Sequence, residues 1–526
     1  MIVTLGSTMR VLLALLLLAS SSAYAQHPRD AEIRDPDTKA WWHTTEALSN
    51  DAMKGRDTGS ADYERAAEYV VKRFQAAGLK PAGTAGSYLQ TVPMHQVQVE
   101  PIGTSLRVVR EDGASVPLEF LQQITIGASA DLAAVDAPLS FRGYCGKDAM
   151  SGVSGRVVVC FGTQRQGLPG AAERVANARA AGAAAVVNVD DPYFTIEPPR
   201  WPYAYARSVT VAAASAGPVP RSSLPVMRIS AEAFPLLIQG SKQDPSTILV
   251  AGGKKSALPS FEIPARLQAR FSLSQKEISS PNVLAMLPGS DPVLKDQIVV
   301  IAAHLDGYGF GTPVAGDALY NGALDDAAYV ALLIQFADNL KAEHRSLKRS
   351  VLFCAFTGEE KGLLGSNYFV EHLTVKKEQL DADVNLDQLR PLFPLKVLTA
   401  LAVDQTTLGQ TARGVASGMG IEIRGDQEPE RGLLRRADQW PFLRIGVPAI
   451  SFIFGYDPGT DAERRYREWY QVRYHRPQDD LTQPIDFEAA GTFDRFFYKL
   501  VETIADAPER PRMLNADIGA ARSSIR

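Results

Sequence analysis

Histidines and acidic residues follow several apolar stretches of this chain. His304 and Asp306 stand in "IAAHLDG", and Glu359 and Glu360 stand in "FTGEEKG", each directly after an apolar run. Asp387 follows a third apolar step, in "DVNLDQL". Imidazoles and carboxylates are metal ligands and proton-transfer groups, so these positions are candidates for a metal-assisted reaction.

Two further segments supply additional donors. "NGALDDAAYVA" places Asp325 and Asp326 where a helix is expected to begin, and "RYHRPQDDL" places His475 in a loop. Taken alone, an acidic pair at a helix start is usually a cap or a partner of the helix dipole, and a single histidine is more often structural. Taken together, two histidines and three carboxylates form the ligand set expected for two zinc ions that share one bridging carboxylate.

The adjacent glutamates fit the same interpretation. Side chains alternate in direction along an extended segment, so Glu359 and Glu360 are expected to point to different sides. One of them can bind a metal ion while the other faces a water molecule bound to that ion. This difference explains why two carboxylates follow a buried strand.

The chain from Pro281 onward contains the elements that would position these residues. Continuous apolar runs predict strands at 282–289, 297–306, 350–360, 395–404 and 447–454. Helical patterns occur between or after them, at 325–344, 363–373 and 493–506. The alternation predicts an α/β fold with a mostly parallel sheet sandwiched by helices. In such sheets the catalytic residues lie in loops at the carboxyl ends of the strands.

The composition excludes some classes of function. The 526 residues are 45% hydrophobic and 22% charged, which is ordinary for a globular protein. The net charge of −4 gives no general electrostatic reason to bind nucleic acid or an anionic membrane. A chain of this length predicts one large or two moderate domains, and no sequence feature defines an oligomeric state.

The first residues are typical of a secretory signal. Arg10 precedes an apolar run over 11–19, and small residues lead to Ala25, which predicts residues 1–25 as a signal peptide cleaved before Gln26. The apolar run is too short to span a bilayer. We therefore expect an exported protein, periplasmic or extracellular, with no membrane anchor after cleavage.

The chain has three cysteines, which are too few for a disulfide scaffold. Cys145 and Cys160 lie near the edges of one short β-rich region, so in an exported protein they could form a disulfide, although the sequence leaves this open. Cys354 lies in an apolar strand and is expected to be a small buried hydrophobic residue.

The ordered set HxD, DD, GEE, LD and YH resembles the co-catalytic di-zinc exopeptidases, which include bacterial leucyl aminopeptidase, aminopeptidase Y and glutamate carboxypeptidase II. The resemblance covers nearly the whole chain after the signal, and "ADQWPFLRIGVPAISF" and "AAGLKPAG" extend it. It implies a peptidase domain formed by 26–130 and 254–507, interrupted by a β-rich protease-associated domain at 131–253. Residues 508–526 are expected to form a loosely ordered tail.

The resemblance also implies a role for each site residue. His304 and Asp387 would bind one zinc ion, Glu360 and His475 would bind the other, and Asp325 would bridge the two. Glu359 would be the general base, Asp306 would orient His304, and Tyr474 would either donate a hydrogen bond to the tetrahedral intermediate or serve as a packing aromatic.

The chain also departs from the family pattern. Tyr329 stands near a position where members commonly have a small residue, and Gln388 replaces the usual continuation after Asp387. Asp383 and Asp381 are therefore alternative ligands. The segment 455–475 resembles an enlarged loop, and its arginines are expected to face solvent rather than a substrate carboxylate. The other histidines are expected to be structural, without carboxylate partners in register with them: His27, His43, His95, His344 and His372.

These features predict a zinc-dependent exopeptidase acting on peptides, in the first place an aminopeptidase. A carboxypeptidase or dipeptidase would use the same site and would require arginines at the pocket, with these candidates: Arg390, Arg431, Arg435 and Arg436. A glutaminyl cyclase on a related fold would use one zinc, which the complete two-zinc set disfavours. A catalytically silent binding ectodomain would lack ligands, and none is missing here.

Overall fold

The computed structural model describes residues 27–193, 206–212, 224–387 and 389–515. The predicted signal peptide, its cleavage point before Gln26 and Gln388 lie outside these residues. In the part of the chain that is described, no helix is long and apolar enough to cross a membrane.

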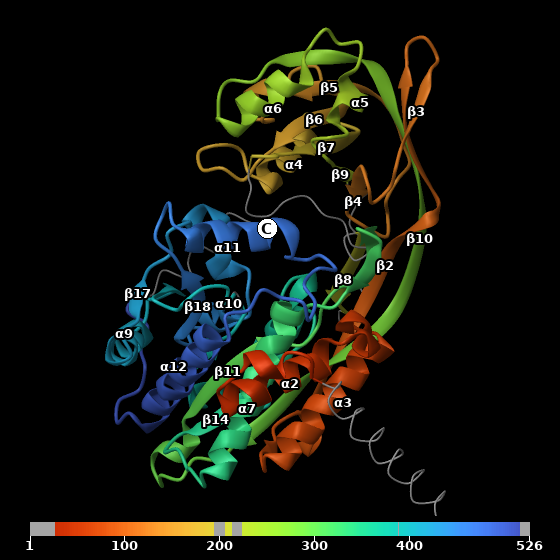
Figure 1. Cartoon of the computed structure of the whole chain (residues 1–526). Helices are drawn as coiled ribbons and strands as arrows, with labels where there is room; N and C mark the ends of the chain where they lie inside the picture. Colours follow the sequence, from red (N-terminus) through yellow and green to blue (C-terminus); the bar gives the residue numbers. More distant parts are fainter. Residues whose placement is uncertain (1–26, 194–205, 213–223, 388, 516–526) are drawn as a thin grey trace, which may run out of the picture.

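A sheet forms the centre of the larger body of the molecule (Figure 1). The strand β11 (Ile298–His304) pairs in parallel with both β14 (Ser350–Phe356) and β15 (Leu380–Asn385). The next strand, β18 (Ala449–Gly455), pairs in parallel with β15. The end of β10 (Ser260–Leu287) pairs antiparallel with β14 at the other side. The predicted α/β fold with a mostly parallel sheet is confirmed.

The sheet continues beyond β18. The strand β16 (Val397–Leu401) pairs antiparallel with β18, and β17 (Glu422–Arg424) pairs in parallel with β16. The helix α9 (Leu408–Gly418) connects these two strands. At the opposite edge, the two-residue strand β1 (Lys80–Pro81) pairs with β10.

Helices cover both faces of this sheet. On one face α3 (Ala61–Ala76), α7 (Ala328–Ala342), α9 and α12 (Phe487–Asp506) pack on the strands, and α2 (Pro36–Ser49) packs on α7 and α12. The other face packs against α8 (Leu364–Glu371) and α10 (Gln439–Arg444), through Phe369 and Phe442. The sheet is therefore buried on both faces, which explains why its strands are continuous apolar runs.

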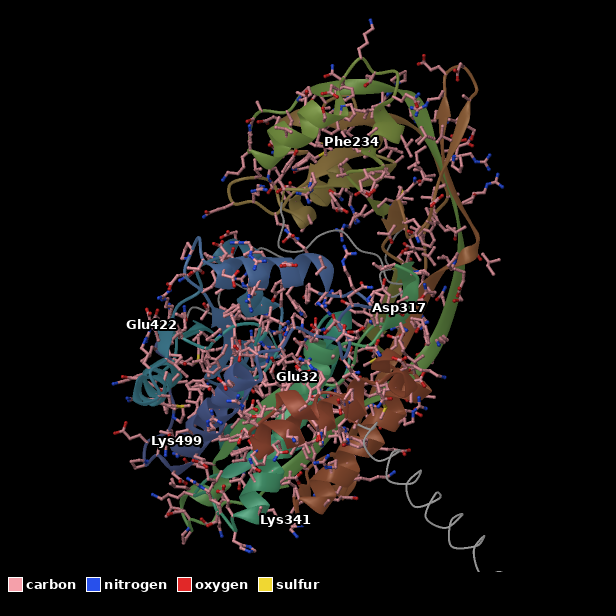
Figure 2. All side chains as sticks on the ribbon, in the orientation of Figure 1. Glu32, Phe234, Asp317, Lys341, Glu422 and Lys499 are labelled. Atoms are coloured by element: carbon pink, nitrogen blue, oxygen red, sulfur yellow. A yellow bond between two sulfur atoms is a disulfide. The ribbon has the colours of Figure 1, made fainter. Side chains whose placement is uncertain are left out.

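Two long strands extend from this body to a second one. In Figure 1, β2 (Leu89–Arg110) and β10 run side by side into the smaller upper body, and they pair antiparallel with each other. The upper body has its own hydrophobic core, which includes Phe234 (labelled in Figure 2). A disulfide joins Cys145 and Cys160 there. That this region is a protease-associated domain at 131–253 stays a prediction.

The upper body is built around parallel strands in the order β5, β6, β7, β9. Its strands are β3 (Ser115–Leu118), β4 (Ile124–Ile126), β5 (Val135–Arg142), β6 (Val157–Gly162), β7 (Ala185–Asp190) and β9 (Val226–Ile229). The strand β8 (Arg207–Val211) instead pairs with residues 94–98 of β2 and packs against α8 of the larger body. The helices of the upper body are α4 (Ala171–Ala180), α5 (Phe234–Ile238) and α6 (Pro245–Gly253). A β-hairpin of β12 (Gly309–Val314) and β13 (Asp317–Tyr320) stands apart from the main sheet.

The prediction of an enlarged loop at 455–475 was wrong, because most of this segment forms the helix α11 (Asp461–Val472). Thr460 caps this helix by accepting a hydrogen bond from the amide of Glu463. Tyr466, Trp469 and Tyr470 recur at helical spacing and are buried on one face. Of the arginines in this segment, Arg464 and Arg465 are exposed, as predicted, while Arg467 and Arg473 are half-buried. None of the four lines the pocket described below.

The described part of the predicted tail is also better anchored than expected. Arg510 forms an ion pair with the buried Asp381, and Met513 forms a β-bridge with Thr406. The rest of the tail, residues 516–526, lies outside the described residues.

Candidate metal centre

The predicted ligands come from separate segments that meet at one edge of the sheet. His304 is the last residue of β11, Asp387 follows β15, and Glu360 lies in a 3-10 turn (Glu359–Lys361) after β14. Asp325 lies in the turn before α7, and His475 follows α11. Parallel strands end at the same edge of a sheet, so these segments meet although they are far apart in the sequence.

Asp325 lies at the centre of the group. Its Oδ1 is 3.3 Å from Nε2 of His304, and its Oδ2 is 3.2 Å from Nε2 of His475. The Nε2 atom of His475 is also 3.4 Å from Oε2 of Glu360. One carboxylate therefore faces two imidazoles with its two different oxygens, which is the arrangement of a ligand that bridges two ions.

The donors form three overlapping groups, each with ligand atoms within 4.8 Å of one another. His304, Asp325 and Asp387 form one group, and Asp325, Glu360 and His475 form another. His304 also groups with Glu359 and Glu360. The first two groups have the composition of the two predicted zinc sites and share Asp325.

The donor set fits zinc. Nitrogen and carboxylate oxygen ligands suit this ion, and each of the first two groups supplies three of them, which leaves a position for water or substrate. Glu360 Oε1 is buried and makes no hydrogen bond within the described part of the chain. A buried carboxylate oxygen without a hydrogen bond is costly unless a cation stabilises it.

A pocket of about 450 Å³ opens onto this group. Its lining contains predicted ligands and general base together with other side chains: Tyr308, Asp325, Glu359, Glu360, Gly362, Leu363, Asp387, Arg435, Arg436, Tyr474 and His475. Leu363 is the one aliphatic side chain among them. The pocket is therefore polar, and several predicted metal ligands form part of its wall.

Burial changes the proton affinity of the two glutamates. It raises the pKa of Glu359 well above its usual value, and the neighbouring Asp387 and Glu360 raise it further. Burial, followed by the charge of Asp325, raises the pKa of Glu360 to about 8. Both shifts arise because several buried carboxyl groups lie close together.

Arg390 acts in the opposite direction on Asp325. Burial alone would raise the pKa of Asp325, but Arg390, followed by His304 and His475, holds it well below its usual value. The Arg390 guanidinium is fully buried, with Nη2 3.6 Å from Asp325 Oδ2. It also donates to the carbonyls of Leu324 and Asp387, at 2.9 Å and 2.6 Å. Arg390 thus connects the loops of two predicted ligands.

Asp306 lies behind His304, as its predicted role requires. The Nδ1 atom of His304 is 3.1 Å from the Asp306 carbonyl oxygen and 3.7 Å from the carboxylate. The Asp306 carboxylate accepts hydrogen bonds from Thr58 Oγ1, at 2.8 Å, and from the Glu359 amide, at 3.1 Å. Asp306 therefore links His304 to the backbone of the predicted general base.

Other supporting residues were not found from the sequence. Asp479 accepts hydrogen bonds from the amides of Leu324 and Asp325, at 3.0 Å and 3.1 Å, and so holds the turn that carries the bridging carboxylate. Tyr308 places its hydroxyl 3.0 Å from Nδ1 of His475. The motifs "AAHLDGYG" and "RYHRPQDDL" contain both residues, but nothing in their spacing shows these contacts.

A turn at the N-terminal side of the domain was also missed. Arg56 is fully buried and donates to the carbonyls of Leu305, Asn321 and Gly322. It therefore fixes the segments on either side of the β12–β13 hairpin. The dipeptide that follows, Asp57-Thr58, contacts Lys361 and Asp306 respectively.

The remaining predicted positions can also be placed. Tyr474 lines the pocket, with its ring against that of His475 at a centroid distance of 3.7 Å. The alternative ligands Asp381 and Asp383 are absent from the three groups, and Asp381 instead pairs with Arg349 at 2.9 Å. Among these aspartates, Asp387 is the one beside His304.

Three of the histidines expected to be structural do have carboxylate partners, and these lie outside their register in the sequence. His27 lies 2.5 Å from Glu46, and His43 lies 2.5 Å from Asp30. His95 on β2 lies 2.7 Å from Glu277 on the neighbouring strand β10. These contacts join residues that are distant in sequence or on different turns, so sequence spacing did not reveal them.

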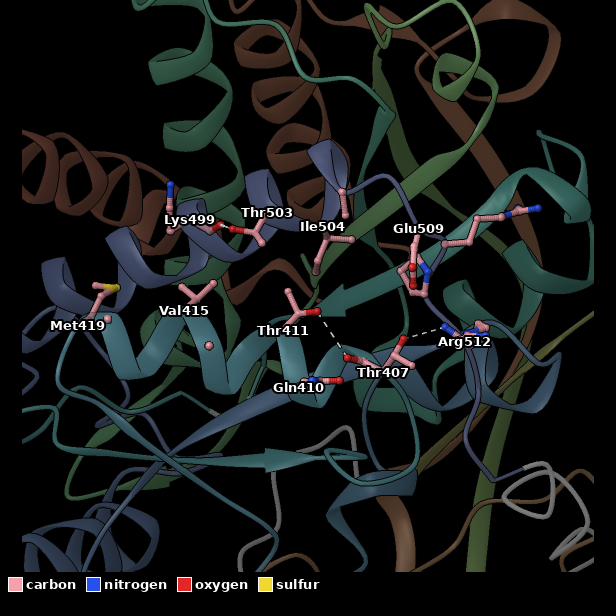
Figure 3. A pocket seen from close by; sticks show the side chains of 15 residues that line it. Thr407, Gln410, Thr411, Val415, Met419, Lys499, Thr503, Ile504, Glu509 and Arg512 are labelled. Carbon is pink, nitrogen blue, oxygen red and sulfur yellow. Dashed lines mark hydrogen bonds between the residues drawn. The ribbon is translucent and has the colours of Figure 1, made fainter.

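A larger hollow of about 660 Å³ lies between α9, α12 and residues 507–512 (Figure 3). Threonines and long basic side chains line it, and Thr407 accepts a hydrogen bond from the Arg512 amide at 2.9 Å. No predicted ligand lies among its lining residues, and the lining contains no histidine. The hollow is therefore separate from the candidate metal centre.

The comparison with known families agrees with this geometry. Residues 282–501 match the model of peptidase family M28. The match covers less than half of the 526 residues. The M28 region contains all eight predicted site residues, and the expected relationship to the co-catalytic zinc exopeptidases is confirmed.

Curated proteins that are similar to this region are named as zinc metalloproteases or aminopeptidases. A "Probable zinc metalloprotease" of Pyrenophora teres f. teres is 28% identical over 254 residues, which cover 44% of this chain and 50% of that protein. "Aminopeptidase YwaD" of Bacillus subtilis is 26% identical over 188 residues, covering 35% and 36%. The matches span between 36% and 59% of the length of the curated relatives.

Solved structures share the fold over most of the chain. An aminopeptidase from Aneurinibacillus sp. strain AM-1 has a TM-score of 0.59 and 18% identity, covering 92% of this chain and 97% of that one. A zinc aminopeptidase from Bacillus subtilis has a TM-score of 0.58 and 20% identity, covering 90% and 96%. These likenesses establish the fold.

One departure from the family pattern, Tyr329, has a structural explanation. Tyr329 is buried in α7 and donates to the Leu389 carbonyl at 2.6 Å. It therefore packs behind the loop that carries Asp387 and does not line the pocket. Of the four arginines considered for a substrate carboxylate, Arg435 and Arg436 line the pocket, while Arg390 and Arg431 are buried outside it.

Proposed function

We propose that this chain is an exported zinc aminopeptidase that removes N-terminal residues from peptides with the help of two metal ions. The observation that carries the proposal is Asp325, whose two carboxylate oxygens face His304 and His475 separately. A mononuclear site would not need a carboxylate shared in this way. The M28 relationship and the names of the relatives support the same reaction.

The ligands divide into two sets. His304 and Asp387 would hold one zinc ion, Glu360 and His475 would hold the other, and Asp325 would bind both. This division follows the two groups of donors that have Asp325 in common. Tyr308 would orient His475 through Nδ1, and Asp306 would orient His304, as partners of metal-bound histidines do.

When bound, the ions would lower the pKa of a water molecule toward neutrality and polarise the peptide carbonyl. Glu359 lies on the pocket wall with its carboxylate 4.0 Å from His304 Nε2, where it can accept a proton from that water. The same carboxyl group can then protonate the leaving amine. Tyr474 and Tyr308 line the pocket and could donate a hydrogen bond to the developing oxyanion, a contribution of about 3 to 4 kcal/mol for a well-placed donor.

A second candidate is an exopeptidase that recognises a substrate carboxylate. Arg435 is exposed and Arg436 half-buried, and both lie on the wall of the same pocket as the ligands. With Leu363 as its one aliphatic side chain, the pocket offers little apolar surface for a leucine-like residue. These features favour an acidic or carboxylate-ended substrate, and a carboxypeptidase or dipeptidase would satisfy them.

Export is part of the proposal. The Cys145–Cys160 disulfide supports it, because disulfides persist mainly in oxidising compartments. Peptides are the expected partners, and the sequence gives no general electrostatic reason for nucleic acid binding.

The test is hydrolysis of one peptide series by the zinc-loaded protein, with the N-terminus free or acetylated and the C-terminus free or amidated. Each peptide is assayed with and without a chelator. Cleavage that requires the free amine and stops with chelator supports the aminopeptidase, while cleavage that requires the free carboxylate supports the second candidate. A well-folded, zinc-loaded protein that cleaves none of the peptides would overturn both.

Arg435→Gln distinguishes the two candidates further. A carboxylate-recognising enzyme should lose kcat/KM on peptides with a free C-terminus or an acidic side chain, and should keep it on amidated neutral peptides. Arg413→Gln is the control, since Arg413 pairs with Asp404 on the surface of α9 and lies outside the pocket. For an aminopeptidase without carboxylate recognition, the ratio of kcat/KM on free peptides to kcat/KM on amidated peptides should be the same in both variants.

A further inference from the structure

The strand β8 brings an arginine from the region between the two long strands to the larger body. β8 lies beside β2 in Figure 1 and pairs with its residues 94–98, while Val209 packs in one cluster with Leu364 of α8. The side chain of Arg207, the first residue of β8, is 9% exposed and forms an ion pair with Asp57. This arginine is therefore held beside the turn that precedes α3.

Asp57 connects Arg207 to a buried lysine. Its Oδ1 accepts a hydrogen bond from Arg207 and is 3.5 Å from Nζ of Lys361. A Cβ atom added to Gly309 would lie only 2.9 Å from Cβ of Asp57. The turn at Asp57 is therefore packed directly against the segment that contains Tyr308.

Lys361 extends this connection to the candidate metal centre. It follows Glu360 in the sequence, and its side chain is 3% exposed, with Nζ 4.6 Å from the centre of the Tyr308 ring. A desolvated ammonium is attracted to an aromatic face more strongly than an exposed one. Nζ makes no hydrogen bond within the described part of the chain, so its position depends on the Asp57 carboxylate and on this ring.

The Tyr308 hydroxyl contacts two predicted ligands of one ion. It lies 3.0 Å from Nδ1 of His475, and it also donates a hydrogen bond to the Glu360 carboxylate. When Nε2 of His475 binds a metal ion, Nδ1 carries the proton and donates to the tyrosine oxygen, so the O–H of the tyrosine stays available for Glu360. One hydroxyl can therefore orient both ligands.

These four residues form the β8 relay: Arg207, Asp57, Lys361 and Tyr308. We propose that the β8 relay positions Glu360 and His475, and that its members are positioning residues for the zinc ion that these two ligands would hold. The inference rests on the two-zinc centre of the proposed function. It adds that the region between the two long strands supports one of the two ions.

The other ion has a separate support. Thr58 follows Asp57 and donates to Asp306, which lies behind His304. Neither contact involves a member of the β8 relay. Two adjacent residues of one turn therefore support one ion each, and their effects can be separated by experiment.

Loss of the Asp57 charge should release the relay. Asparagine keeps the size of the side chain but removes the negative charge that faces two cations. The buried ammonium of Lys361 then lacks a counter-ion and turns toward solvent, because a buried unpaired charge is costly. Tyr308 loses the cation over its ring. Arg207→Gln should act in the same direction with a smaller effect, since Lys361 keeps its contact with Asp57.

The test is the zinc affinity of the full chain, measured by competition with a fluorescent chelator in two backgrounds. His304→Ala leaves the site of Glu360 and His475, and His475→Ala leaves the other site. We expect Asp57→Asn to weaken zinc binding about 10- to 100-fold in the His304→Ala background, and to leave it unchanged in the His475→Ala background. A substitution that only destabilised the fold would not separate the two sites.

Arg228→Gln is the matched control. Arg228 of β9 also donates to a buried aspartate, Asp190, at 2.9 Å, but this pair lies in the upper body. It should leave zinc binding unchanged in both backgrounds. Asp57→Asn with no effect in the His304→Ala background, or with equal effects in both backgrounds, would overturn the proposal.

The outcome can be told apart from a failure of the proposed function. Zinc affinity is measured without substrate, so a difference confined to one site stands even if the chain cleaves no peptide. A parent protein that binds a single zinc ion would overturn the two-zinc centre and the role of the relay together.

Discussion

Thr58→Val tests whether the second layer of contacts supports the metal centre. The Thr58 hydroxyl donates to Asp306 at 2.8 Å, and both side chains are at most 1% exposed. Valine preserves the shape of threonine but removes the donor, so a buried carboxylate oxygen loses its partner. Leaving such a group unsatisfied costs about 1 to 3 kcal/mol, and more when it is charged.

The effect should extend to metal affinity. Asp306 stands behind His304, and changes to the partners of a metal-bound histidine typically weaken binding about 10- to 100-fold. That range corresponds to about 1.4 to 2.8 kcal/mol. Zinc affinity is measured by competition with a fluorescent chelator, and the free energy of unfolding of the metal-free protein is measured with urea.

Thr163→Val is the control for a lost hydroxyl. Thr163 is also buried and donates to a buried aspartate, Asp191, at 3.0 Å, but this pair lies in the upper body. Both substitutions should lower stability, whereas only Thr58→Val should weaken zinc binding. Equal zinc affinities in the two variants would refute the reasoning that Asp306 transmits the effect to His304.

Four further outcomes are expected. Glu359→Gln should retain two zinc ions at the centre but lose about 100- to 10,000-fold in kcat, as measured by metal analysis and peptide hydrolysis; an active variant would exclude Glu359 as the base. Burial raises the pKa of Asp438 to about 7, so protonation of this carboxyl group stabilises the folded chain. This stabilisation is fully present below about pH 4 and is lost as pH rises through 7. Urea unfolding of the metal-free protein should therefore show Asp438→Asn gaining stability over the parent between these pH values, and a constant difference would contradict this. Replacing Cys145 and Cys160 by alanine should destabilise the upper body by about 3 kcal/mol, since the disulfide closes a separation of 15 residues, with kcat unaffected. Chelation should lower the melting temperature and increase proteolysis of the turn at Asp325, and unchanged protection would argue against a bridging role.

The sequence was most informative where chemistry and secondary structure coincide. A strand buried on both faces appears as a continuous apolar run, so the end of each run is visible, and polar residues there stand out. His304 and Asp387 could be placed at one edge of the sheet because parallel strands end together. The same reasoning left Asp381 and Asp383 open, since they are close in sequence and the loop geometry after β15 decides between them.

Contacts that depend on tertiary packing could not be predicted in this way. The helix α11 was mistaken for a loop because its many charged residues hide a buried face of Tyr466, Trp469 and Tyr470. Arg390 was considered for a substrate carboxylate, but it is buried and directed at Asp325. An arginine can bind a substrate carboxylate or pair with a buried aspartate. The position of its loop in the fold determines which of the two it does.

The turn around Asp57 shows why the supporting residues could not be predicted from the positions of strand ends. Asp57 lies about 250 positions before the first metal ligand, and no apolar run leads to it. Its carboxylate nevertheless binds Arg207 of β8 and lies 3.5 Å from Lys361, the residue after Glu360. Lys361 in turn lies over the ring of Tyr308, whose hydroxyl contacts His475. A single carboxylate thus connects the strand β8, which pairs with the long strand β2, to two predicted ligands of the same ion. Because each link is a tertiary contact between loops, the connection exists only in the folded chain.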